Sequence, residues 1–262
     1  MNVFAKAREK YPLPAEEEAN LVQLLVASIL LTAFAAVICS IILCCLHGED
    51  VFAAVTSGWA QAIATALAVS WPLSLGAGVA LAIAMIAVDR VAEALAWRSE
   101  NGRAGVLDVR RGISGEMARL PLWKTALLMV GVGCAEEAGF RFAVIGIVLA
   151  VAEPPLGFGA AAAVAVIAST AVFAIMHTQY RCLYAQAVVV TVGAILGIFY
   201  VLAGMLAAVV VAHALYDFCL LTLEARHMVR DPDYFEGEAP INAVEEEYRR
   251  ARERAGGTDT DD

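Results

Sequence analysis

A short run of charged residues stands inside a long apolar stretch of this 262-residue chain. Residues 136–141 read EEAGFR, and Lys124 is the only other charged residue in the segment 121–152. A charged side chain near the centre of a membrane costs about 2.5–3.5 kcal/mol on insertion scales, so such a residue usually has a function. The two glutamates and the arginine of this run are therefore the first candidates for chemistry.

The spacing within the run separates the roles of the two glutamates. In a helix, Glu137 and Arg141 are four residues apart with the acid first, which is the favoured orientation for an ion pair. Glu136 lies about 100° away around the helix and lacks that partner. A carboxylate without a fixed counter-charge suits a general base. We therefore expect Glu136 to do the chemistry and the Glu137–Arg141 pair to support it.

Two later apolar segments each carry further polar side chains. His177 lies four residues after Phe173 in FAIMH, and alone it is more typical of a membrane interface than of catalysis. His213 lies four residues before Asp217 in HALYD, where a carboxylate can hold one imidazole nitrogen or simply form a buried hydrogen bond. Together with Glu136, these side chains form a Glu–His–His–Asp set that can activate water, bind a metal or clamp helices together. Spacing alone leaves these alternatives open.

The composition assigns the chain to the integral membrane proteins. Hydrophobic residues make up 61% of the sequence, compared with about 45–50% in soluble domains. Long uncharged runs predict an all-α bundle of six transmembrane helices in the segments 21–46, 51–88, 121–152, 160–180, 183–203 and 205–223. Nothing in the charge pattern is typical of nucleic-acid binding, so we expect the lipid bilayer and no nucleic acid among the partners.

The segment 51–88 is too long for one straight crossing and is interrupted by Pro72, Gly76 and Gly78, so it is either one kinked helix or two short ones. The distribution of basic residues favours a single membrane crossing through this segment. The segment 89–120 carries six arginines and is expected in the cytoplasm, whereas the segment 47–57 has no lysine or arginine. With one crossing through 51–88, both termini are predicted to be cytoplasmic.

The chain divides into four predicted parts. Residues 1–20 form a polar cytoplasmic N-terminus, and residues 21–120 form two transmembrane helices followed by the basic loop. Residues 121–224 form a four-helix catalytic core that carries every candidate residue. Residues 225–262 form a soluble tail, in which helix-forming residues and acid-to-base pairs predict a helix over 243–255.

The ordered motifs EExxxR, FxxxH and HxxxN/D resemble those of the CPBP family of intramembrane proteases. This family contains type II CAAX prenyl endopeptidases together with bacteriocin-processing and self-immunity proteins. The motifs stand here at 136–141, 173–177 and 213–217, and the resemblance covers about residues 121–224. It implies that Glu136 and His177 activate a water for peptide hydrolysis, and that the last motif stabilises the oxyanion. Glu137 and Arg141 would then support Glu136, with Phe173 completing the second motif.

The last motif ends in Asp217 instead of asparagine. An ionised aspartate cannot donate a hydrogen bond to an oxyanion. Asp217 is therefore expected to orient His213, to be protonated itself, or to bind a metal. The family is labelled a metalloprotease family, and a metal-free Glu–His mechanism has also been argued for its prenyl-protein members, so zinc stays open as a cofactor.

These observations predict an intramembrane endopeptidase, a hydrolase acting on a membrane-associated protein or peptide in a bacterial cytoplasmic membrane. Its polar residues should line a hydrated cavity that opens to the cytoplasm, because hydrolysis needs water. The alternatives are an inactive family member that acts in immunity or binding, and a proton-coupled transporter. The sequence has no inverted repeat, which weakens the transporter alternative. Function that survives loss of Glu136 would favour either alternative over a hydrolase.

Overall fold

The computed structural model describes residues 2–178, 180, 182–230 and 234, and within them the chain forms helices and no strand. The predicted all-α class is thereby confirmed. The elements in chain order, with η for π-helices, are α1 (Val3–Lys10), α2 (Ala15–Leu46), α3 (Val51–Ala53), η1 (Ala54–Gly58), α4 (Trp59–Ala68), α5 (Trp71–Ala96), α6 (Glu100–Arg111), α7 (Ile113–Met117), α8 (Leu122–Glu137), η2 (Ala138–Val144), α9 (Ile145–Leu156), α10 (Phe158–Met176), α11 (Leu183–Ala203) and α12 (Leu206–Arg230).

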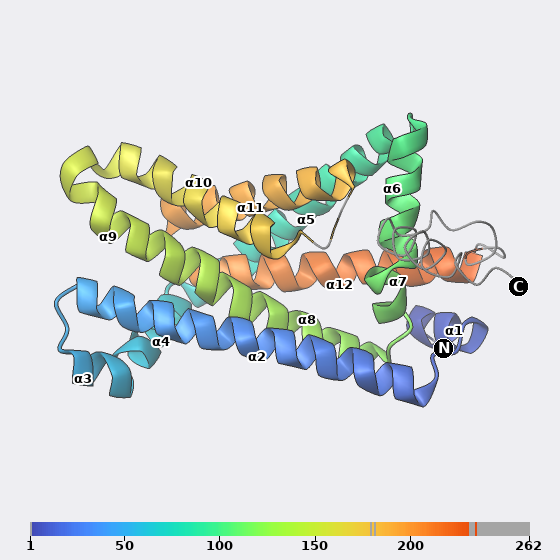
Figure 1. Cartoon of the computed structure of the whole chain (residues 1–262), viewed down its shortest axis with the longest axis horizontal. Coiled ribbons are helices and arrows are strands. Elements are labelled where there is room, and N and C mark those ends of the chain that lie inside the picture. Colours follow the sequence, from blue (N-terminus) through green and yellow to red (C-terminus); the bar gives the residue numbers. More distant parts are fainter. Residues whose placement is uncertain (1, 179, 181, 231–233, 235–262) are drawn as a thin grey trace, which may run out of the picture.

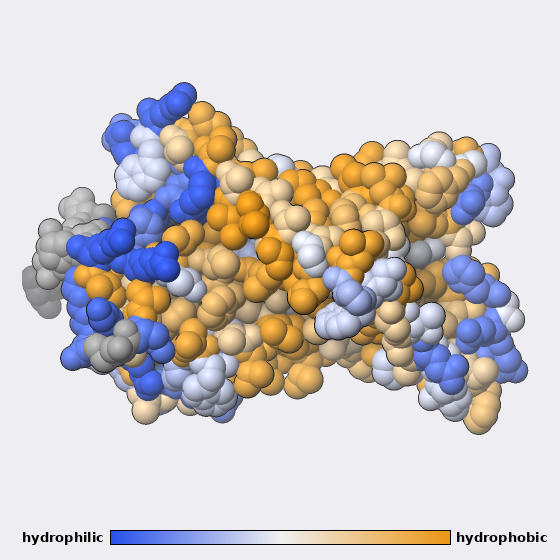
Figure 2. Space-filling model, turned by 180° about the vertical axis from the view of Figure 1, so that it is seen from behind, coloured by the Kyte–Doolittle hydropathy of each residue, from blue (hydrophilic) through white to orange (hydrophobic). Residues whose placement is uncertain are grey.

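The long helices run roughly along the longest axis of the molecule, and α1 and the last turns of α12 lie at the same end (Figure 1). Apolar side chains cover the middle of the surface, whereas hydrophilic side chains gather at both ends (Figure 2). Six helices in the described residues are long and apolar enough to cross a membrane, namely Ala15–Leu46, Val51–Ala68, Trp71–Ala96, Phe158–Met176, Leu183–Ala203 and Leu206–Arg230. The chain is therefore an integral membrane protein, as predicted.

The sequence left the segment 51–88 open between one kinked helix and two short ones. The structure shows more than one helix, because α4 ends at Ala68 and α5 begins at Trp71. Between them, Ser70 has a left-handed backbone with φ of 48°, and Pro72 starts α5 at a position where a missing N–H costs nothing. In Figure 1, α3 and α4 lie at the end of the molecule where α2 ends, and α5 runs from there to the opposite end.

The predicted span 121–152 is also divided, into α8, η2 and α9. The π-helix leaves the Phe140 carbonyl open to a further donor, and the hydroxyl of Ser169 on α10 donates to it at 2.8 Å. Such single π-helical turns inside α-helices occur frequently at functional sites. Farther along, two prolines stand in the last turn of α9, and Gly157, with φ of 74°, turns the chain into α10. The turn between the predicted spans 121–152 and 160–180 is therefore narrow, because α9 ends at Leu156 and α10 begins at Phe158.

Helix α12 packs extensively against both α5 and α8. A Cβ atom added to Gly133 on α8 would lie 3.1 Å from the carbonyl oxygen of Val210 and 3.2 Å from the amide of Ala214. On the other side, a Cβ on Gly78 of α5 would lie 2.7 Å from the side chain of Val211. Small residues let membrane helices approach closely in this way. The two glycines therefore set how closely α12 approaches both neighbours.

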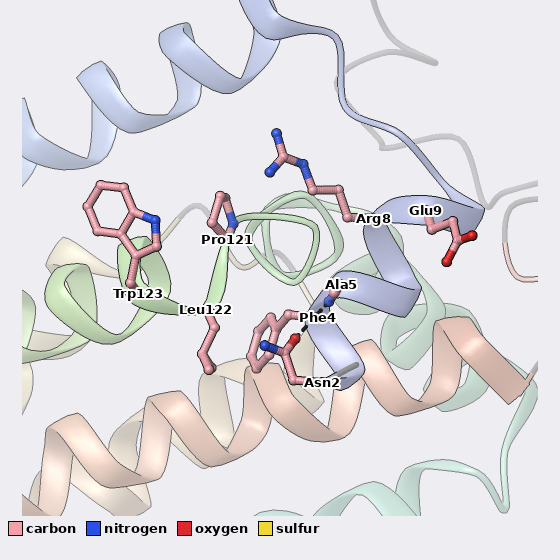
Figure 3. Close-up of a pocket in the computed structure, with 8 residues that line it drawn as sticks. All are labelled: Asn2, Phe4, Ala5, Arg8, Glu9, Pro121, Leu122 and Trp123. Atoms are coloured by element: carbon pink, nitrogen blue, oxygen red, sulfur yellow. Dashed lines mark hydrogen bonds between the residues drawn. The ribbon is translucent and has the colours of Figure 1, made fainter.

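The N-terminal residues contain more structure than the predicted polar segment 1–20. Helix α1 buries Phe4, which stacks on Phe218 of α12 with ring centroids 5.9 Å apart. The carboxylate of Glu18 accepts from Arg8 at 2.7 Å and from Lys124 at 2.6 Å, so it joins α1, α2 and α8. A cavity of about 580 Å³ lies between α1 and the start of α8, lined by Phe4 and Trp123 among others (Figure 3).

At the other end of the chain, α11 has the predicted bounds, and α12 continues to Arg230, beyond the predicted end at residue 223. The helix predicted over 243–255 lies outside the described residues.

Candidate active site

The structure brings the three motifs together from four elements. Glu136 and Glu137 are the last two residues of α8, and Arg141 lies in η2. Phe173 lies on α10, and His177 caps the C-terminus of that helix. His213 and Asp217 lie one turn apart on α12. Since α12 packs directly on α8 and α10 packs on η2, the side chains of all three motifs can meet.

The predicted pair of Glu137 and Arg141 is present. The Nε atom of Arg141 lies 3.2 Å from Oε2 of Glu137, and both side chains have no exposed surface. The guanidinium also lies over the ring of Phe173, 4.7 Å from the ring centroid, and donates to the carbonyl of Gly193 at 3.4 Å. A buried ion pair of this kind holds both charges only while both partners remain.

Glu137 has a second role that the spacing did not predict. Its Oε1 accepts a hydrogen bond from Nδ1 of His213 at 2.7 Å, across the contact between α8 and α12. One carboxylate thus joins Arg141 and His213. With Nδ1 held in this way, the other ring nitrogen of His213 faces the remaining carboxylates, which fixes the orientation of the imidazole.

The Nε2 atom of His213 faces two carboxylates. Asp217 Oδ2 lies 3.4 Å from it, and Glu136 Oε2 lies 3.8 Å from it. Asp217 is therefore close to His213, as predicted, but it lies at the nitrogen opposite to the one that Glu137 holds. Because Glu137 makes the shorter contact with His213, it is the better placed of the two to orient the ring.

Exposure separates the two glutamates. The side chain of Glu136 is 18% exposed and that of Asp217 is 25% exposed, whereas Glu137 is fully buried. Glu136 lies within electrostatic range of both His177 and His213, and its Oε2 has no hydrogen-bond partner among the described residues. The cluster thus has a fully buried side made by Glu137 and Arg141 and a more open side made by Glu136 and Asp217.

His177 is held by its own helix and by aromatic rings. Its Nδ1 atom donates to the carbonyl of Phe173 at 2.8 Å, which leaves Nε2 for another partner. The ring of Phe173 lies 4.3 Å from that of His177 and 6.1 Å from that of His213, measured between centroids. Phe140 meets Phe173 edge-on at 5.2 Å. Phe173 is therefore the apolar wall against which both histidines pack.

Sequence reasoning missed two residues next to this cluster. The side-chain amide of Gln186 donates to the carbonyl of His177 at 2.9 Å and to that of Tyr180 at 2.7 Å. The ring of Tyr180 stacks on that of His177 with centroids 6.2 Å apart. A polar residue in the first turn of an apolar helix was the available signal for Gln186. No pattern singled out Tyr180, because its role depends on how the turn folds back.

Zinc, left open by the sequence, can be tested on the arrangement of possible ligands. Among residues 2–178, 180, 182–230 and 234, no group of three or more His, Cys, Asp or Glu side chains is arranged to hold a metal ion. The described residues therefore do not fit a zinc site, and no step proposed below passes through a metal.

Residues 118–219 match the family model described as Type II CAAX prenyl endopeptidase Rce1-like. No curated protein and no solved structure matches the chain. The matched segment runs from the turn before α8 into α12 and contains all three motifs, whereas α1 to α7 lie outside it. The resemblance of the chain to the CPBP family of CAAX proteases is therefore confirmed, and it rests on residues 118–219.

Proposed function

We propose that this protein is an intramembrane endopeptidase that hydrolyses a peptide bond of a membrane-associated protein or peptide. The observation that carries the proposal is the division between the two neighbouring glutamates. Glu137 is fully buried and engaged by Arg141 and His213, whereas Glu136 is partly exposed, has no arginine partner among the described residues and lies within electrostatic range of two histidines. The match of residues 118–219 to CAAX endopeptidases supports a peptide bond as the target.

In the proposed reaction, Glu136 accepts a proton from a water molecule as the water attacks the scissile carbonyl carbon. His177 would help to hold this water through Nε2, because its Nδ1 is already bound to the Phe173 carbonyl. The proton on Glu136 then passes to the leaving amine as the C–N bond breaks. General base catalysis of this kind contributes about 10²–10⁴-fold to a rate.

His213 is proposed to stabilise the negative charge that develops on the carbonyl oxygen. Its Nδ1 is held by Glu137, so Nε2 is the nitrogen that faces the reaction. When both ring nitrogens carry a proton, Nε2 can donate to the oxyanion. Glu137 and Arg141 act through this histidine and are positioning residues in the proposed mechanism.

The setting of the reaction completes the proposal. Residues 121–224 form the catalytic core in a bacterial cytoplasmic membrane, with residues 1–20 and the tail 225–262 in the cytoplasm. The segment 21–120 adds membrane helices and the basic cytoplasmic loop. The presence of α1 and the end of α12 at one end of the molecule supports placing both termini on the same side of the membrane (Figure 1).

The test is cleavage by purified protein reconstituted in liposomes, with a model transmembrane peptide and a prenylated peptide as two separate substrates. Wild type should cleave at least one of them, and Glu136→Gln should cleave neither at a comparable protein yield. Equal cleavage by both proteins would contradict the proposed role of Glu136. Tight peptide binding by both proteins without cleavage would instead support the alternative of an inactive binding or immunity protein.

A further inference from the structure

Tyr180 lies in the turn between α10 and α11, directly beside the candidate active site. Its backbone N–H donates to the carbonyl of His177 at 3.1 Å, so the chain folds back after the end of α10. The ring of Tyr180 is then nearly parallel to that of His177, with an interplanar angle of 14°. The turn therefore places a phenol next to the histidine that is proposed to hold the attacking water.

Gln186 anchors this turn to α11. Its side-chain amide donates to the carbonyls at both ends of the turn, His177 at 2.9 Å and Tyr180 at 2.7 Å. A single side chain thus fixes the distance between the two residues. The position of Tyr180 is set by hydrogen bonds within the protein and does not depend on a bound substrate.

The surroundings of Tyr180 keep its hydroxyl protonated. Burial, together with the nearby carboxylates of Asp217 and Glu136, raises the pKa of Tyr180 to about 12. The phenol is therefore a hydrogen-bond donor at every pH at which the protein would work. Within the described part of the chain, its hydroxyl donates to no other group.

The proposed reaction needs such a donor. Negative charge develops on the carbonyl oxygen, yet Glu136, Glu137 and Asp217 all contribute carboxylates to the cluster. An ionised aspartate at position 217 can accept hydrogen bonds but cannot donate one. His213 alone would then face the oxyanion, and donors in such sites each matter by about 10²–10³-fold.

We propose that the Tyr180 hydroxyl is a further catalytic group, which donates a hydrogen bond to the carbonyl oxygen of the scissile peptide. This inference rests on the proposed function. Tyr180 would supply the hydrogen-bond donor that Asp217 does not. The stacking of Tyr180 on His177 would then hold this donor in position.

The test compares Tyr180→Phe with Tyr200→Phe, using a peptide that wild type cleaves in a Glu136-dependent manner. Both variants lose one hydroxyl from a partly buried tyrosine, but Tyr200 lies at the other end of α11. Tyr180→Phe should lower kcat by about 10²-fold with little change in KM, because the hydrogen bond forms only in the transition state. Tyr200→Phe should match wild type.

A second measurement covers the case of a poorly folded variant. A peptide with a phosphinate in place of the scissile bond mimics the tetrahedral intermediate. Its affinity should be lower for Tyr180→Phe than for wild type, whereas the affinity of the cleaved product peptide should be the same for both proteins. A wild-type kcat for Tyr180→Phe, with a loss only in Tyr180→Ala, would overturn the inference and leave the ring as packing. Wild-type protein without Glu136-dependent cleavage would overturn the proposed function itself, and this inference with it.

Discussion

Two clusters of charged side chains lie on α12 and its neighbours, and they are built differently. The site cluster consists of Glu136, Glu137, Arg141, His213 and Asp217. The end cluster lies where α5, α6 and α12 meet and consists of Asp89, Arg90, Glu93, Arg110 and Glu224. The first has three carboxylates and one arginine, which pairs only with Glu137, and the second has an arginine beside each of its three carboxylates.

Every carboxylate of the end cluster is balanced. Arg90 pairs with Asp89 and with Glu93, the latter at 2.5 Å, and Arg110 pairs with Glu93 and lies 3.9 Å from Glu224. Neighbouring side chains complete the network, since Tyr184 donates to Asp89 at 3.0 Å. Such a network joins helices, and nothing in it is left to react.

The site cluster is balanced only on its buried side. Glu137 contacts both Arg141 and His213, whereas the more exposed Glu136 has no arginine partner among the described residues and approaches His213 only to 3.8 Å. A carboxylate without an arginine partner is costly in an apolar environment, so its presence is best explained by a role in chemistry. The comparison therefore indicates that a charged side chain in a membrane helix is not by itself a sign of function, and that the carboxylate without an arginine partner is the better candidate.

The largest expected effect follows from removing Glu136, the glutamate without an arginine partner among the described residues. Glu136→Gln should lower kcat/KM by about 10²–10⁴-fold, because the general base is lost, while the thermal midpoint stays near that of wild type. Peptide cleavage and thermal unfolding of the same preparation measure both quantities. Glu93→Gln in the end cluster is the matched control and should keep cleavage per folded molecule. Equal loss of cleavage in both variants would erase the distinction between the clusters.

Removing the buried partner should instead affect stability. Glu137→Gln leaves Arg141 without a counter-charge at a fully buried position, which costs about 3–5 kcal/mol. Unfolding in detergent with increasing denaturant reports this loss. The variant should also lose activity, because His213 is no longer held. A Glu137→Gln protein as stable as wild type would show that the buried pair is not what holds α8 and η2 in place.

Asp217→Asn should have a smaller effect. Glu137 already holds His213 through Nδ1, so an amide at position 217 leaves the imidazole in place and adds a donor beside the reaction. We expect activity within about tenfold of wild type, which is about 1.4 kcal/mol in transition-state stabilisation. Cleavage should be assayed with and without a chelator. A severe loss that added zinc restores would assign Asp217 to a metal site and contradict the proposed mechanism.

The smallest effect is expected in the end cluster. The Arg90 side chain is 38% exposed, and its two acidic partners keep other contacts, since Glu93 pairs with Arg110 and Asp89 accepts from Tyr184. Arg90→Gln should therefore change the free energy of unfolding by only about 0–1 kcal/mol and leave cleavage unchanged. Thermal unfolding at low and high salt would check this. A drop in cleavage without a drop in stability would mean that this cluster also takes part in the reaction.

Local spacing was enough for the features that lie within one helix. The pairing of Glu137 with Arg141 follows from the helical repeat, which places residues four apart on one face. The apolar runs alone identified an all-α membrane protein, because a membrane-spanning backbone must satisfy its hydrogen bonds internally. The order of the three motifs also led to the family that residues 118–219 match.

The contacts between helices were decided only by the tertiary structure. The hydrogen bond between Glu137 and His213 joins residues on different helices. It depends on the axial position of α12 along α8 and on the rotation of α12 about its own axis. Gly133 sets that approach by letting the two backbones come close, and composition does not reveal which partner it faces. The left-handed Ser70 that splits 51–88, and the turn that brings Tyr180 onto His177, likewise depend on backbone angles that no hydrophobic repeat encodes.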